Sequence, residues 1–295
     1  MKKQQGHKDP MVQLERTLAE AVNRARDPGC PPTFTEALDY AIFPGGHRIR
    51  PHLCLAVAAA CGNDQPMLAS ASAAAIEMLH CASLIHDDLP CFDDADIRRG
   101  KPSVHKAYGE QIAVLAGDAL IVMSFELIAR HGAVIPERLA PLIDIVGSSV
   151  SVPRGIVAGQ AWESESKLDL ANYQQEKTGS LFAAATMAGA SACGYVGKEW
   201  QILGLRIGEA YQVADDIRDV VSTEEEIGKP VGQDDAHSRP NAARALGLEG
   251  AVDHLEALVT EAVESIPACP GRDMLHGMMI KESQRFLPKK LRRAA

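Results

Sequence analysis

Two clusters of aspartate in this 295-residue chain are suited to binding divalent cations. The first runs from Asp87 to Asp96 and places five carboxylates in ten residues, directly after an apolar segment. The second contains Asp215, Asp216 and Asp219 within another apolar segment. Residues four apart lie on one face of a helix, so Asp215 and Asp219 are expected to point the same way. Carboxylate oxygens are ligands that magnesium prefers.

A solvated acidic helix end is the alternative interpretation of the first cluster. Aspartates at a helix C-terminus oppose the helix dipole, and close carboxylate pairs repel by about 4 kcal/mol each at an effective dielectric of about 20. Bound cations would offset that cost. Neither cluster has the cysteine and histidine set that zinc prefers. The two clusters together therefore predict magnesium sites.

Basic side chains near these clusters could bind phosphate groups. Arginine offers a planar fork that matches phosphate oxygens, and lysine offers a compact charge. A single basic residue is more often a surface residue, but basic residues beside metal ligands indicate a site for diphosphates. These residues are Arg48 and Arg50 in the segment Gly45-Gly46-His47-Arg48-Ile49-Arg50-Pro51, Arg98 and Arg99 after the first cluster, and Lys177 and Lys229.

These motifs identify a family resemblance: from about residue 34 to residue 247 the chain resembles bacterial trans-isoprenyl diphosphate synthases. The resemblance rests on both aspartate motifs, the glycine–arginine segment, and three shorter motifs. Segments 84–102 and 234–241 look most similar to geranylgeranyl diphosphate synthases of carotenoid and bacteriochlorophyll pathways. The shorter motifs are Gly159-Gln160-x-x-Glu163, Lys177-Thr178-Gly179 and Gly228-Lys229-Pro230.

The resemblance implies an all-α isoprenoid synthase fold, with helices around a deep central cavity and two copies in a homodimer. It implies a prenyltransferase that condenses isopentenyl diphosphate with dimethylallyl, geranyl or farnesyl diphosphate. Metal-assisted ionisation of the allylic diphosphate, condensation and proton elimination would follow in turn. Geranylgeranyl diphosphate is the expected product, and farnesyl diphosphate is the alternative.

The resemblance also assigns roles to individual residues. Arg98 and Lys177 would contact the allylic diphosphate, whereas His47, Arg50, His80 and Arg99 would contact isopentenyl diphosphate. Thr178 and Gln212 would stabilise the carbocation, and Lys229 and Arg239 would bind diphosphate from the segment after the second motif. Three Mg²⁺ ions would be held by Asp87, Asp88, Asp93, Asp215, Asp216 and Asp219.

The sequence departs from the family pattern at three of these positions. His47 stands where many members have a lysine, and histidine is only partly charged near neutral pH. That replacement puts the affinity for isopentenyl diphosphate in doubt. Arg239 stands where a lysine often follows the second motif, and Glu163 replaces a usual aspartate, so both keep their charge.

Product length should depend on the side chains about one helical turn before Asp87. An ideal helical wheel places Ser83 beneath Asp87 and turns Ala82 about 140° away. The family resemblance nevertheless singles out Ala82, where relatives that make farnesyl diphosphate tend to carry an aromatic residue. Both side chains are small, so either one leaves room for a chain longer than fifteen carbons.

Three rival functions are a class I terpene cyclase, a regulatory subunit without catalysis and a generic acidic helical bundle. Such cyclases usually carry an asparagine-serine-glutamate second motif, which Asp215-Asp216-x-x-Asp219 does not match. The aspartates at both motifs oppose a regulatory subunit, and a generic bundle does not explain two clusters. A prenyltransferase remains the best interpretation.

Composition limits the partners and the location. The formal net charge of −9 argues against a nucleic-acid partner, because phosphate contacts need a basic surface. The seven cysteines are scattered and show no C-x-x-C spacing, which favours a reduced, cytoplasmic location. The N-terminus lacks the apolar stretch of a secretory signal. No uninterrupted apolar run approaches roughly 18 residues, so no transmembrane segment is expected.

Apolar residues spaced three and four apart predict helices rather than strands. We expect one domain over residues 1–295, with frayed ends at 1–10 and 288–295. Many small residues favour closely packed helices. The predicted helical segments are 11–25, 49–61, 67–89, 111–129, 179–193 and 198–221.

Overall fold

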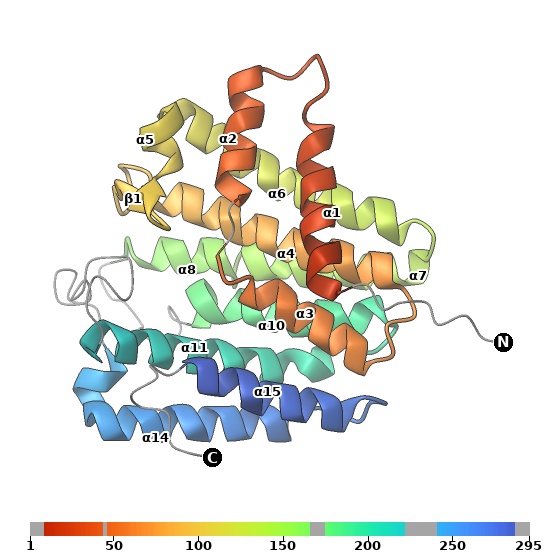
Figure 1. The fold of residues 1–295 in the computed structure, drawn as a ribbon, viewed down its shortest axis with the longest axis vertical. Helices are drawn as coiled ribbons and strands as arrows, with labels where there is room; N and C mark the ends of the chain where they lie inside the picture. The colour runs from red at the N-terminus through yellow and green to blue at the C-terminus, as the bar shows by residue number, and fades with distance from the viewer. Residues whose placement is uncertain (1–8, 44–45, 166–174, 222–240, 287–295) are drawn as a thin grey trace.

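The computed structural model describes residues 9–43, 46–165, 175–221 and 241–286. Helices make up nearly all of the ordered elements in these ranges (Figure 1). The N-terminal half contains α1 (Pro10–Arg24), α2 (Pro32–Ile42), α3 (Ile49–Ala60), α4 (Pro66–Asp87), α5 (Val104–Tyr108), α6 (Glu110–Gly132) and α7 (Pro136–Val150). The remainder contains α8 (Ile156–Trp162), the π-helical turn η1 (Gln175–Gly179), α10 (Ser180–Ala192), the 3₁₀ turn η2 (Gly197–Trp200), α11 (Gln201–Val221), α14 (Ala242–Glu264) and α15 (Arg272–Phe286).

The structure confirms most of the helices that the periodic segments of the sequence predicted. The segments 11–25, 49–61, 67–89, 111–129 and 179–193 correspond to α1, α3, α4, α6 and α10. The segment 198–221 is divided into η2 and α11. Proline in the first turn starts α1, α2, α4 and α7, where its missing N–H costs nothing. The side chain of Asn241 caps α14 by accepting from Arg244 N.

The core is centred on α4 and α10. Ala73, Ala74 and Ala75 on α4 are fully buried, and α10 buries its alanines in the same way. Helix α4 contacts α1, α3, α6 and α10, and α10 in turn contacts α7 and α11. Figure 1 shows α4 and α10 between α1 and α2 on one side and α11, α14 and α15 on the other. Small side chains let these helices approach closely, as the composition predicted.

Among the described residues, two helices are long and apolar enough to cross a membrane by length and composition alone. The count of uninterrupted apolar residues did not predict this. The apolar stretch of α4 is 83% buried inside the protein, which is typical of a core helix, whereas that of α6 is only 39% buried. Helix α6 therefore presents apolar side chains outward.

A two-stranded hairpin follows the end of α4. Strand β1 (Ile97–Arg98) pairs antiparallel with β2 (Lys101–Pro102), and Arg98 lies opposite Lys101. The two residues of the turn, Arg99 and Gly100, have φ values of 56° and 75°. Positive φ at both central residues is the geometry of tight hairpin turns that match strand twist. The strands are too short to produce a detectable alternation in the sequence, so they were not predicted.

Candidate active site

The first aspartate cluster folds back over the C-terminal end of α4. Asp93 N donates to Asp87 O at 2.9 Å, and Ala95 N donates to Asp88 O at 3.2 Å. Burial raises the pKa of Asp87, and the nearby Asp93 raises it further. Burial also raises the pKa of Asp88, with a further contribution from Asp87. The cluster is thus a set of crowded carboxylates at a helix end, as the sequence predicted.

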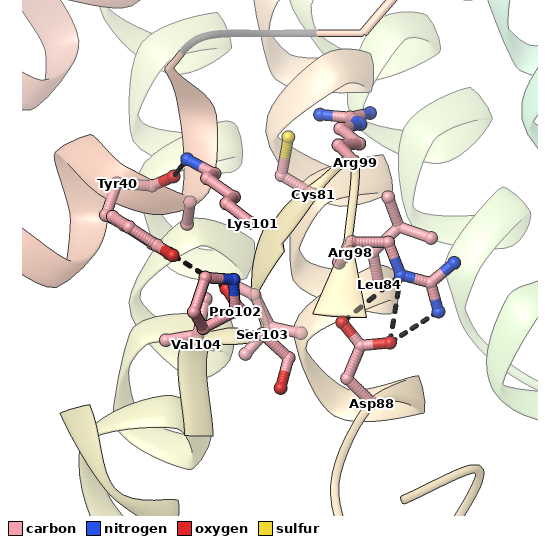
Figure 2. Close-up of a pocket in the computed structure, with 12 residues that line it drawn as sticks. Tyr40, Cys81, Leu84, Asp88, Arg98, Arg99, Lys101, Pro102, Ser103 and Val104 are labelled. Carbon is pink, nitrogen blue, oxygen red and sulfur yellow. Dashed lines mark hydrogen bonds and ion pairs between the residues drawn. The ribbon is translucent and has the colours of Figure 1, made fainter. Parts of the chain in front are cut away.

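Two cations from other elements contact these carboxylates. Lys177 Nζ lies 3.2 Å from Asp87 Oδ1 and 2.8 Å from Glu163 Oε1. Arg98 Nε donates to both oxygens of Asp88, at 2.9 Å and 3.2 Å, and Arg98 Nη2 also contacts Asp88 (Figure 2). The structure therefore brings Arg98, Lys177 and Glu163 together with the first motif.

The position of Lys177 depends on close packing of α8 against η1. A Cβ atom on Gly159 would lie 2.6 Å from Lys177 N, so only glycine fits there. Gly155 N at the start of α8 donates to Glu176 Oε2 at 2.6 Å. The close packing of α8 against η1 explains the spacing of the Gly159-Gln160-x-x-Glu163 motif. It places Glu163 beside Lys177, with Thr178 next in the turn.

The second aspartate cluster has three different environments on α11. The half-buried Asp215 accepts from Arg218 Nη2 at 3.2 Å. Asp216 is only 4% exposed, and its two oxygens accept from Gln212 Nε2 at 3.0 Å and from Ala242 N at 2.8 Å. Asp219 is buried, with Arg244 Nη2 4.0 Å away.

Asp216 also ties α11 to the start of α14. Asn241 Nδ2 donates to Asp216 O at 3.2 Å, while the carboxylate of Asp216 receives the first N–H of α14. A carboxylate at a helix N-terminus is stabilised by the helix dipole. This cap was not predicted, because Asn241 lies 25 residues further along the chain.

A cluster of cations lies between α3, α4 and the hairpin. Arg50 Nη1 lies 3.4 Å from His80 Nε2, and the Arg50 guanidinium lies 4.4 Å from the centre of the Phe182 ring. Within the described ranges Arg50 Nε has no hydrogen-bond partner. Burial lowers the pKa of Arg50, and the charge of Arg99 lowers it further.

His80 is held neutral by the same surroundings. Burial lowers its pKa well below 6.5, and the charges of Arg50 and Arg99 add to this effect. The cluster therefore has excess positive charge and one neutral imidazole, which suits a polyanion. His47 is exposed on the segment before α3.

The residues expected to set product length differ in exposure. Ala82 is 1% exposed and packs in the core of α4. Ser83 is half-buried on the side of α4 that also exposes His80 and Asp87, and its Oγ donates to His80 O at 2.8 Å. The exposed side of α4 therefore follows the helical wheel. Lys229 and Arg239 lie outside the described residues.

A pocket lies beside the hairpin (Figure 2). Arg98, Arg99, Cys81, Leu84 and Lys101 are among its lining residues. In the figure the side chains of Arg98 and Arg99 point in different directions, with only Arg98 directed to Asp88. A second, larger pocket, lined mainly from α2 and the preceding loop, contains none of the predicted site residues.

The donor set of the aspartate motifs fits magnesium in kind, because it consists of carboxylate oxygens. No three acidic, histidine or cysteine side chains in the described part of the chain are arranged to hold a metal ion. Arg98 and Lys177 instead occupy oxygens of Asp88 and Asp87. Metal binding would therefore exchange protein cations for metal at the first motif.

Known proteins share this fold and sequence. Residues 31–270 match the model of the polyprenyl synthetase family. Geranylgeranyl diphosphate synthase from Cereibacter sphaeroides is 52% identical over 93% of this chain and 96% of its own length. The enzyme of that name from Rhodobacter capsulatus is also 52% identical, over 91% of this chain and 94% of its own.

Solved structures confirm the isoprenoid synthase fold. A geranyltransferase from Helicobacter pylori, complexed with magnesium and isoprenyl diphosphate, has a TM-score of 0.74 and 30% identity, covering 93% of this chain and 97% of that one. An FPP/GFPP synthase from Zymomonas mobilis also has a TM-score of 0.74 and 30% identity, covering 93% and 98%. The chain belongs to the polyprenyl synthetase family.

Proposed function

We propose that this protein is a geranylgeranyl diphosphate synthase, which condenses isopentenyl diphosphate with allylic diphosphates. One observation carries the proposal: two chemically different anion-handling sites meet at the hairpin. Arg98 faces the aspartates of the first motif, and the next residue, Arg99, adds its charge to Arg50 and His80. A condensation of two diphosphates needs two such sites, whereas a cyclase needs one. The 52% identity to two geranylgeranyl diphosphate synthases supports this product.

The two sites would divide the reaction between them. At the first site the C–O bond of the allylic diphosphate breaks, and its electron pair leaves with the diphosphate. Arg98 and Lys177 would hold the negative charge that develops there. The double bond of isopentenyl diphosphate, held by the second site, then supplies the electrons of the new C–C bond. Loss of a proton restores a double bond in the lengthened product.

Thr178 and Gln212 would stabilise the carbocation that forms between these sites. Thr178 follows Lys177 in η1, and both residues are half-buried. Gln212 donates its amide hydrogen to Asp216, which leaves its carbonyl oxygen able to face a positive centre. Oxygen dipoles of this kind would stabilise a carbocation without trapping it covalently.

Magnesium, when bound, would offset charge on the leaving diphosphate. Exposure favours Asp87, Asp93 and Asp215 as direct ligands, because these carboxylates are half-buried rather than buried. Asp88, Asp216 and Asp219 are buried and contact Arg98, Gln212 and Arg244 respectively, so they support the first three residues. Three Mg²⁺ ions, as expected for this family, would be held by the aspartates of the two motifs.

We also propose a cytoplasmic homodimer that associates through α6. Val114, Leu115 and Val122 on α6 are 40%, 53% and 58% exposed, which makes an outward apolar stripe on an element well packed against α4 on its other side. A second copy would bury this stripe. The free cysteines of the described chain support a reducing compartment.

Substitution of the metal-ligand candidates tests this function. We expect Asp87→Asn and Asp215→Asn to lower kcat for prenyl transfer by about 10²-fold or more, because each removes a carboxylate ligand of the magnesium that would offset the charge of the leaving diphosphate. Asp144→Asn is the matched control, since Asp144 is exposed on α7. Thermal unfolding should show folded proteins in all three cases. Activity of Asp87→Asn within a few-fold of wild type would remove the metal assignment.

A further inference from the structure

The C-terminal end of α2 binds two cationic side chains, Lys101 from the hairpin and Arg48 from the segment that follows α2. The last carbonyls of a helix have no partner within the helix and need donors from elsewhere. Lys101 Nζ donates to Tyr40 O at 2.6 Å (Figure 2). It also donates to Phe43 O at 2.9 Å. Arg48 Nη2 donates to Ile42 O at 3.0 Å. Both cations therefore bind backbone carbonyls of the same helix end.

Arg48 is turned into the protein, unlike Arg50 two residues later. Arg48 is 6% exposed, and its Nη1 lies 2.7 Å from Oε1 of Glu77, which is 2% exposed. Its Nε also lies 2.9 Å from Glu15 Oε1 on α1. With Ile42 O, these contacts join α1, α2 and α4 at the residue that precedes α3. The φ of 50° at Arg48 is the left-handed conformation that directs it there.

Lys101 anchors the hairpin on α2 in a similar way. Its ammonium lies 3.7 Å from the centre of the Tyr40 ring, in addition to its two carbonyl contacts. Tyr40 Oη donates back to Pro102 O at 2.7 Å. Lys101 thus points to α2, while Arg98 on the opposite strand points to Asp88 (Figure 2).

The two anchored segments meet at the cation cluster. A Cβ atom on Gly46 would lie 3.0 Å from Arg99 Nε, so the segment before α3 runs directly against Arg99. Burial lowers the pKa of Arg50, and the like charge of Arg99 lowers it further, so these two guanidinium groups disfavour each other. Holding like charges together before a ligand arrives requires anchors outside the cluster.

We propose that Arg48 and Lys101 are positioning residues for the second diphosphate. They bind the end of α2 rather than the ligand, and they hold Arg50, Arg99 and His47 in the arrangement that binds isopentenyl diphosphate. This inference rests on the proposed function. Arg98 and Lys177 also contact Asp88 and Asp87, so the site of the allylic diphosphate is expected to depend less on this anchor.

Lys101→Met is the central test, because methionine keeps the apolar stem of the side chain and removes its charge. We expect the KM for isopentenyl diphosphate to rise about tenfold, equivalent to about 1.4 kcal/mol. The KM for farnesyl diphosphate should stay within about twofold, because Arg98 and Lys177 would bind that substrate. Uniform damage to the site would instead raise both KM values. Lys106→Met is the matched control, since Lys106 is exposed and pairs only with Asp94 and Asp96 among the described residues.

Arg48→Lys tests the second anchor without stranding the charge of Glu77. Arg48→Met would leave a buried carboxylate without its partner and risks unfolding the protein. Lysine keeps the charge but cannot bind Ile42 O, Glu77 and Glu15 with one planar fork. Arg48→Lys should also raise the KM for isopentenyl diphosphate. In the double variant with Lys101→Met, the rise in KM should be smaller than the product of the two single rises, because both residues act on one helix end.

Binding of inorganic diphosphate separates this inference from the proposed function. The full chain is titrated calorimetrically with inorganic diphosphate in the presence of EDTA, so that only protein cations bind it. Lys101→Met should bind about tenfold more weakly than wild type and Lys106→Met. Equal affinities, or an equal rise of both KM values in Lys101→Met, would overturn the positioning role. A wild type that binds diphosphate but transfers no prenyl group would reject the proposed function and leave the anchor supported by its binding arm.

Discussion

In the proposed function, the neighbouring residues Arg98 and Arg99 would each serve a different diphosphate site. Arg98 belongs to β1 and contacts Asp88, whereas Arg99 has a positive φ and turns toward the segment before α3. Adjacent strand residues point to opposite faces, and the tight turn increases this separation. In the proposed function, the hairpin would hold two diphosphates side by side, which is what a condensation requires.

His80 should make the stability of the protein depend on pH. Its folded pKa lies well below the value of 6.5 that it has when unfolded, because it is buried beside Arg50 and Arg99. Between those two values the unfolded chain binds a proton that the folded chain does not. Stability is therefore fully present above about pH 6.5 and is lost as the pH falls toward the folded pKa.

We predict that His80→Gln loses less thermal stability than wild type between about pH 7.5 and about pH 5.5, because glutamine does not titrate. The midpoint of thermal unfolding at the two pH values measures this difference. His276→Gln serves as the control, since His276 is exposed on α15. Identical losses in wild type and His80→Gln would show that folding does not lower the pKa of His80.

Several site residues could be predicted from the sequence because their partners are close along the chain or their motif is specific. Asp87, Asp88 and Arg98 fall within one short segment. The separate roles of Arg48 and Arg50 could not be predicted, because both are arginines in one motif and differ only in backbone conformation. The cap that Asp216 provides for α14 was likewise hidden, since its partner comes from another helix.

Helix α4 combines the metal motif with the floor of the expected product cavity. Its alanines let α6 and α10 pack closely, and its exposed side carries His80, Ser83 and Asp87 in succession. A spacing of three to four residues keeps these side chains on one stripe. The growing chain should therefore pass Ser83 first, one turn of about 5.4 Å below Asp87.

We predict that Ser83→Phe shifts the product from twenty to fifteen carbons, because a ring at that position would block the stripe below Asp87. Ala82→Phe should instead lower the midpoint of unfolding, since overpacking a buried site costs about 1–3 kcal/mol. Chromatography of the dephosphorylated products and thermal unfolding measure both effects. A shorter product from Ala82→Phe alone would show that the cavity runs along the face of Ala82.

Apolar spacing predicted the helices that have long apolar segments, and it did not predict the others. Segments such as α3 and α10 are apolar over most of their length and were found. Helix α7 contains an internal proline, Pro141, and α8 is short, so neither gave a sustained pattern. The turn η1 packs closely against α8, and no local propensity encodes that contact.

Over the whole molecule, α6 presents an exposed apolar surface that a partner could cover. Most of its apolar stretch is not buried in one chain, although its inner face contacts α4. A second copy would cover the stripe at Val114, Leu115 and Val122. The acidic net charge of −9 gives no attraction to anionic lipid.

We predict that Val122→Glu converts a dimer into a monomer in analytical ultracentrifugation, because a charge on the covered stripe would be desolvated without a partner. Val134→Glu is the matched control, since Val134 is 77% exposed and lies just beyond α6. Wild type that sediments as a monomer, or Val122→Glu that remains a dimer, would place the interface elsewhere.

The most direct test of the central claim is the product that the purified wild-type chain makes from isopentenyl diphosphate and farnesyl diphosphate with magnesium. The product is dephosphorylated and identified by mass spectrometry, with EDTA-treated protein as the control. Our account predicts magnesium-dependent formation of a twenty-carbon alcohol, geranylgeraniol, and the same end product from dimethylallyl and geranyl diphosphates. Failure to extend farnesyl diphosphate, or an end product of fifteen carbons from the shorter starters, would contradict it.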